Sequence, residues 1–111
     1  MQVLFNARGA EALAWREVAV MRTRFVMRRL HWMVPRAYVH LDDVNGPRGG
    51  PDKRCRIELR APGADPLVVT SIATDWRRAL DTALKRAAHA LMRWWRRRRT
   101  QPPALRRVPS R

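Results

Sequence analysis

The sequence is poor in cysteine, in acidic residues and in long uncharged apolar runs. Its single cysteine, Cys55, excludes an internal disulfide and cannot form a cysteine-based metal cluster. No uncharged apolar stretch approaches the roughly 18 residues that a membrane-spanning helix needs. The N-terminus lacks a basic start followed by an apolar run, so no signal peptide is expected. These absences favour a soluble, cytoplasmic protein.

Side chains that could carry catalysis are also scarce. Ser71 is the one serine before the C-terminal segment, and it has no convincing histidine–acid pair to activate it. His40 and Asp42 share a strand face, but no third metal ligand is evident. The glycine-rich stretch 46–50 is not followed by the Gly-Lys-Ser/Thr of a phosphate-binding loop. We therefore expect no enzymatic activity, no metal and no cofactor, with Cys55 as an inert buried thiol.

What the chain has in abundance is positive charge. Its 111 residues include 24 Lys or Arg and nine Asp or Glu, which gives a net charge of +15. Arginine outnumbers lysine by 22 to 2, and its planar guanidinium both binds phosphate through two N–H groups and stacks on bases. The 46% apolar content suffices for the core of one domain. Such a chain favours an anionic partner: nucleic acid, an acidic membrane surface or an acidic protein.

The longest predicted element is a helix over residues 75–99, which no proline or glycine interrupts. Thr74 or Asp75 can cap its first amides. Apolar residues recur at spacings of three and four and form one stripe: Trp76, Leu80, Ala83, Ala87, Leu91 and Trp94. A second, polar stripe lies about half a turn away: Arg78, Thr82, Lys85, His89, Arg93 and Arg96, flanked by Arg86 and Arg97. One face of this helix is thus suited to a core and the other to negative charge.

The basic face of this helix lacks balancing acids. From residue 75 to the end, the sequence has twelve Lys or Arg and two acids, Asp75 and Asp81. Like charges at i,i+4 each destabilise an isolated helix by a few tenths of a kcal/mol. A solvated surface is the ordinary explanation of a charged stripe, but repeated repulsion favours a helix that meets a polyanion.

The remaining elements are short and separated by turns. Alternation and composition predict strands at 1–7, 37–42, 54–60 and 67–73, and a helix at 11–30. The 11–30 helix has a core stripe at Leu13, Val20, Thr23, Met27 and Leu30, with a second stripe at Trp15, Val18 and Phe25.

The resulting fold class is α+β, with the order β-α-β-β-β-α. The last three strands form an antiparallel meander, and both helices cover one face of a four-stranded sheet. The wet face carries Tyr38, His40, Arg54, Arg56, Glu58 and Arg60. Residues 1–99 make the domain, and 100–111 is a disordered basic tail.

Two segments carry a resemblance to a known family. The loop and strand LDDVNGPRGGPDKRCRI at 41–57, and the helix opening TDWRRALD at 74–81, resemble the ribosome hibernation promoting factors. This family is also called ribosome-associated inhibitors or sigma-54 modulation proteins. The resemblance implies a fold like that of double-stranded-RNA-binding domains and the short form of the family, without its extra dimerisation domain.

The same resemblance implies a function for the basic helices. Family members bind the small ribosomal subunit and its 16S rRNA in the decoding channel and silence idle ribosomes under stress. A monomer that acts on ribosomes in the cytoplasm, with no membrane and no small-molecule substrate, is the expectation. The implied RNA-binding residues are Arg22, Arg28, Arg29, Lys85, Arg86, His89, Arg93, Arg96 and Arg97.

Three other functions stay open on the sequence. The domain could bind a structured RNA outside the ribosome, or regulate transcription through a sigma factor, as the older family name suggests. Trp94 and Trp95 beside four arginines are a weaker indication of membrane adhesion.

We predict that deleting residues 100–111 leaves cooperative unfolding intact. The segment lies outside every apolar stripe, and its three arginines are few beside those of the preceding helix. Ribosome binding should weaken only modestly. Thermal unfolding followed by circular dichroism checks the fold, and a truncated protein that no longer unfolds cooperatively would contradict the predicted domain boundary.

Overall fold

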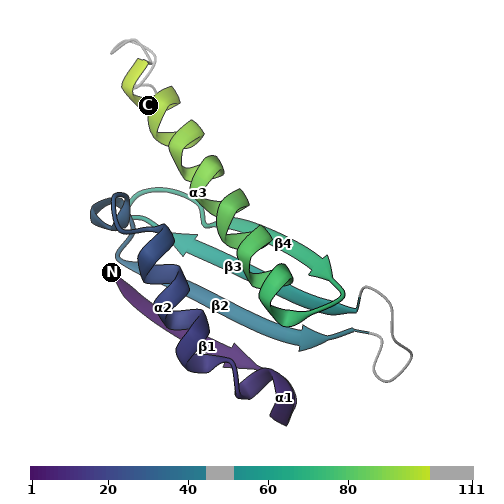
Figure 1. The fold of residues 1–111 in the computed structure, drawn as a ribbon. Coiled ribbons are helices and arrows are strands. Elements are labelled where there is room, and N and C mark those ends of the chain that lie inside the picture. The colour runs from purple at the N-terminus through teal and green to yellow at the C-terminus, as the bar shows by residue number, and fades with distance from the viewer. Residues whose placement is uncertain (45–51, 101–111) are drawn as a thin grey trace.

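The computed structural model describes residues 1–44 and 52–100, without the side chains of Arg99 and Thr100. It shows a four-stranded sheet with all of its helices on one face (Figure 1). The elements are β1 (Gln2–Ala7), α1 (Ala10–Leu13), α2 (Arg16–Val26), the 3-10 helix η1 (His31–Met33), β2 (Arg36–Asp43), β3 (Lys53–Arg60), β4 (Leu67–Ala73) and α3 (Trp76–Thr100). The strand order is β1-β2-β3-β4, with β1 parallel to β2 and the other neighbours antiparallel.

This architecture confirms the predicted α+β class, the antiparallel meander and the placement of the helices on one face. The likeness to double-stranded-RNA-binding domains stays a prediction. Most of the turn predicted between the second and third strands, and all of the predicted tail except Thr100, lie outside the described residues.

The inward face of the sheet follows from strict alternation along β2 and β3. Val39 pairs with Ile57, and Ile57 pairs with Val69 on β4, so apolar side chains stack across three strands. The predicted inward residues are all buried: Ala37, Val39, Leu41, Cys55, Ile57 and Leu59. Because side chains alternate between faces, their neighbours in sequence point to the other face of the sheet.

The apolar stripe of α3 packs on β3 and β4 (Figure 1). Ala79, Ala83 and Ala87 are fully buried, so small side chains let the helix lie close to the sheet. The Asp75 carboxylate caps the helix by accepting the Arg78 backbone N–H at 2.7 Å. Burial along the stripe ends at Leu91, and beyond it α3 extends past the sheet (Figure 1).

The prediction of one continuous helix over residues 11–30 is wrong. Over this segment the chain forms α1 and α2 and then a turn that leads into η1, and hydrogen bonds at the breaks span three residues rather than four. The Trp15 N–H bonds to the Ala12 carbonyl at 3.1 Å, and the Leu30 N–H bonds to the Met27 carbonyl at 2.8 Å. Such 3-10 bonds tighten the turn and satisfy carbonyls that a helix end leaves without a partner.

The core stripe predicted for this segment is also partly wrong. Leu13 and Phe25 are 46% and 56% exposed, whereas the buried positions are Ala12, Ala19, Thr23 and Met27. The Thr23 hydroxyl donates to the Ala19 carbonyl at 2.7 Å, which lets this polar residue enter the core. The remaining predicted stripe residues are half-buried: Trp15, Val18, Val20 and Leu30.

We predict that Ile57→Asp unfolds the domain. Ile57 is fully buried at the centre of β3, and an unpaired carboxylate there costs several kcal/mol, comparable with the whole stability of a small domain. Thermal unfolding by circular dichroism measures the effect. The control is Ile72→Asp, because Ile72 is 52% exposed on the outer sheet face and pairs in register with Arg54. Unchanged melting of the Ile57 variant would contradict the assigned face.

Candidate nucleic-acid interface

The outward side of α3 is cationic along most of its length. We define the cationic face of α3 as six exposed residues: Lys85, Arg86, His89, Arg93, Arg96 and Arg97. The sequence has no acid from Thr82 onward, so the helix offers these side chains no carboxylate of its own. The face lies opposite the buried stripe because both repeat with the helical period.

Asp81, the one acid within α3, lies near the start of the helix and forms two ion pairs. Asp81 accepts the Nε–H of Arg22 from α2 and the Nε–H of Arg77, each at 3.1 Å. Arg22, predicted as an RNA contact, therefore links the two helices. Each member of the Arg22–Asp81 pair is about a third exposed, so the pair adds at most about 1 kcal/mol to stability.

The other acids gather mainly where β2 ends and β3 begins. Lys53 Nζ lies 2.8 Å from Asp43, 3.5 Å from Asp52 and 3.9 Å from Glu11, and the hydrogen bond to Asp43 raises the pKa of Lys53. Lys53 also lies over the ring of Trp76, with Nζ 5.4 Å from the ring centre. The Trp76 indole N–H donates to Glu11 at 3.1 Å. These contacts hold α1, β3 and the start of α3 together.

The sequence offered Asp42 and His40 as possible metal ligands, but the Asp42 carboxylate is paired with Arg54. It accepts two N–H groups of Arg54 at 2.8 and 2.9 Å, and this hydrogen bonding raises the pKa of Arg54. His40 Nε2 lies 3.9 Å from the same carboxylate. Among residues 1–44 and 52–100, no three His, Cys, Asp or Glu side chains are grouped to hold a metal ion.

The opposite end of the molecule is strongly basic. The end of α2, the start of β2, the end of β3 and the last turns of α3 meet there (Figure 1). Exposed cationic residues at this end are Arg28, Arg29, Arg36, Arg60, Arg96, Arg97 and Arg98. Cations in the last turns of α3 also complement the helix dipole, which accounts for part of the arginine run. Arginines outnumber acids at this end, where Arg60 donates to Glu58 at 2.6 Å, and this gives the domain a charge asymmetry along α3.

Several predicted binding residues contact the protein itself. Arg86 Nη1 donates to the Thr70 carbonyl at 2.9 Å, which directs its side chain over β4. Arg28 donates to the Phe25 carbonyl at 2.7 Å, and its guanidinium lies 4.2 Å from the centre of the Phe25 ring. Both side chains are exposed and held in defined positions, so they are partly ordered before any ligand arrives.

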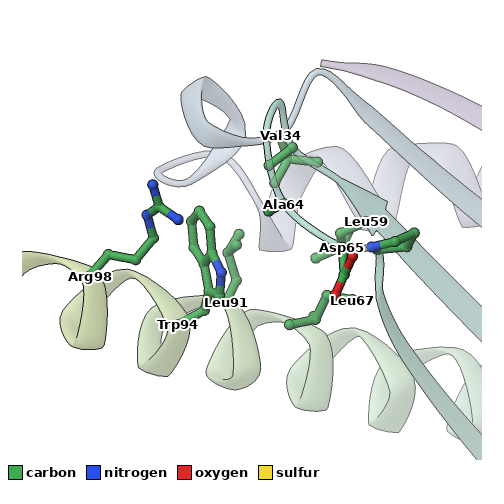
Figure 2. A pocket seen from close by; sticks show the side chains of 11 residues that line it. Val34, Leu59, Ala64, Asp65, Leu67, Leu91, Trp94 and Arg98 are labelled. Atoms are coloured by element: carbon green, nitrogen blue, oxygen red, sulfur yellow. The ribbon is translucent and has the colours of Figure 1, made fainter. Parts of the chain in front are cut away.

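A second feature of the basic end is a hollow that sequence reasoning missed. It lies between α3 and the turn joining β3 to β4, has a volume of about 720 Å³, and is lined by Leu91, Trp94, Asp65 and Arg98, among others (Figure 2). The Arg98 guanidinium lies 4.9 Å from the Trp94 ring. Trp94, predicted to end the core stripe, is only half-buried because α3 has passed the edge of the sheet. In the sequence, the pair Trp94-Trp95 followed by four arginines was the feature that could have indicated this hollow.

None of the described helices is both long enough and apolar enough to cross a bilayer. The apolar stripe of α3 is instead buried against the sheet from Trp76 to Leu91.

Comparison with solved structures identifies the fold. The chain is similar to a ribosomal subunit interface protein from Coxiella burnetii, with a TM-score of 0.66, 14% identity, and coverage of 86% of this chain and 98% of that one. It is also similar to the N-terminal domain of Protein Y from Thermus thermophilus, with a TM-score of 0.63, 20% identity, and coverage of 85% and 99%. No protein-family model and no curated protein matches the sequence significantly. The predicted α+β fold, a four-stranded sheet with its helices on one face, is thus shared with these two structures.

We predict that Cys55 resists alkylation in the folded protein and that stability falls at high pH. Burial raises the pKa of the Cys55 thiol from 9.0 to about 12. Between these values the unfolded chain releases a proton that the folded chain retains, so stability falls as pH rises from about 9 to about 12. A Cys55→Ala variant should lose this component of the pH dependence. Rapid labelling of the native thiol by iodoacetamide at pH 8 would contradict the buried assignment.

Proposed function

We propose that this protein binds the small ribosomal subunit in the cytoplasm and inhibits translation by idle ribosomes. One observation carries the proposal. The apolar face of α3 packs on the sheet, and its outward face presents cations. The sequence contains no acidic residue from Thr82 to its end. A surface of this kind suits the dense phosphates of structured RNA. The fold shared with a ribosomal subunit interface protein supports the ribosome as the source of that RNA.

The proposed mechanism is steric. A rigid domain in the decoding channel of the small subunit would exclude messenger and transfer RNA, while its helices neutralise phosphates of the 16S rRNA. Affinity would come from Arg28 and Arg29 at the end of α2 and from the cationic face of α3. The acid-rich end would point away from the phosphates, so the charge asymmetry would also orient the protein as it approaches.

The proposal needs no catalytic step, cofactor or second subunit. Cys55 is buried and Asp42 is bound by Arg54, so two of the side chains considered for chemistry serve the fold. The protein would act as a monomer and by occupancy alone. Its effect on translation would then follow its concentration relative to idle ribosomes.

We predict that replacing Arg86, His89 and Arg93 together by Ala removes the protein from small subunits at moderate salt. All three side chains are exposed, and alanine favours helix, so melting should change little. The salt dependence of binding should fall by about one unit for each phosphate that the variant no longer neutralises. Co-sedimentation in sucrose gradients measures binding, and translation in a cell extract should resume when the variant replaces the wild type.

The matched control is Arg8→Ala with Arg56→Ala. It also removes two formal charges, but Arg8 follows β1 and Arg56 lies on the outer sheet face, away from α3. This control should bind nearly as well as the wild type. Equal losses in both variants would mean that net charge alone drives binding. A wild-type protein that binds a structured RNA but never migrates with small subunits would favour the non-ribosomal alternative.

A further inference from the structure

An aromatic groove on the helix side of the basic end is not explained by phosphate neutralisation. It has a volume of about 590 Å³ and is lined by Val26, Arg28, Arg29, Leu30, Trp32, Met33, Met92 and Trp95. Residues from the end of α2, from η1 and from α3 thus meet in one place. Among the described residues, two arginines and no acid line it, so its charge is complementary to a phosphate-bearing ligand.

Trp32 is the distinctive residue of this groove. It is 63% exposed, although a tryptophan side chain ordinarily buries a large apolar area. The Trp32 and Trp95 rings lie edge to face, with centroids 5.9 Å apart and an interplanar angle of 86°. The two rings therefore form a right-angled corner, and η1 holds Trp32 in it, because the Met33 N–H bonds to the Leu30 carbonyl at 3.0 Å.

We propose that this groove is a subsite for an unpaired RNA base, which stacks on Trp32 while Arg28 and Arg29 hold the adjoining phosphates. The inference rests on the proposed function and specifies the kind of RNA that this end of the protein binds. A base within a duplex is covered on both sides by its neighbours, so only an unpaired, unstacked base can lie flat on an exposed indole. An edge-to-face corner suits a flat ring that stacks on one indole and abuts the other.

A lipid surface is the main competing occupant, because it also combines phosphate with apolar groups. An interfacial helix would need a continuous apolar face, and that of α3 is buried on the sheet as far as Leu91. Among the α3 side chains that the structure describes, Met92 and Trp95 line the groove. The apolar surface that α3 adds to the groove is therefore two side chains, which is too little for a helix that lies along a bilayer.

The test compares a single-stranded oligoadenylate with a hairpin duplex of equal phosphate number at one fixed salt concentration. Trp32→Leu keeps apolar bulk but removes the stacking ring, and Trp32→Phe keeps an aromatic ring. We expect the Leu variant to bind the single strand about 5- to 150-fold more weakly, the range given by base–aromatic stacking, with duplex binding unchanged. The Phe variant should retain most of the affinity. Ile72→Ala, which trims an exposed apolar residue on the outer sheet face, should bind like the wild type.

A second measurement uses the unaltered chain. The indole N–H signals of the five tryptophans can be followed by NMR as oligoadenylate is added, with each signal assigned by triple-resonance experiments on the wild-type protein. The Trp32 signal should shift most, while those of Trp76 and Trp15 stay in place. This readout holds even if a Trp32 variant folds poorly.

Three outcomes would overturn the subsite: equal binding by the Leu and Phe variants, equal losses for single strand and duplex, or a Trp32 signal that responds to anionic phosphatidylserine vesicles but not to RNA.

The proposed function is tested separately. If Trp32→Leu binds oligoadenylate like the wild type and still migrates with small subunits, the subsite is wrong and ribosome binding stands. If the wild type binds oligoadenylate through Trp32 but never migrates with small subunits, the subsite stands as an RNA site and the ribosomal proposal fails.

Discussion

The packing of one face of α3 on β3 and β4 is the constraint on which the rest of the structure depends. Leu80 and Leu84 are fully buried, and each contributes about 1.5–3 kcal/mol relative to an exposed side chain. The fully buried alanines of the same face allow close approach. Because the helical period assigns each residue to one side, this packing also turns Lys85, His89 and Arg93 toward solvent. The core and the candidate interface therefore result from a single arrangement.

A chain of net charge +15 must also control repulsion between its own cations, and the positions of its few acids show how it does so. Asp81 links Arg22 of α2 to the first turns of α3. Lys53 lies among Asp43, Asp52 and Glu11 at the far end of the sheet. These acids thus stabilise the region where strands and helices meet, at the end of the sheet away from the last turns of α3. Binding of a polyanion along the cationic face of α3 would lower the repulsion between neighbouring cations of the helix.

The two proposed kinds of RNA contact lie on separate parts of the surface. The cationic face of α3 offers charge along a regular helix, which suits phosphates and carries little base selectivity. The groove at Trp32 offers a flat aromatic surface and is also lined by two arginines, which suits an unpaired base and its phosphates. A protein with both would distinguish folded RNA that contains exposed bases from a plain duplex, and ribosomal RNA has both features.

The sequence by itself determined the elements that have a clear period. Strict alternation identified the inward residues of β2 and β3, and spacings of three and four identified the buried stripe of α3, because each pattern requires only local geometry. It did not determine the break after α1 or the exposure of Leu13 and Phe25, since the 11–30 segment is apolar over a wide arc and several faces were equally suitable. Tertiary structure also decided that Arg22 pairs with Asp81, and that Trp32 meets Trp95 from 63 residues away. Such contacts depend on how separate elements are placed relative to one another, and the residue spacing within one element does not determine that placement.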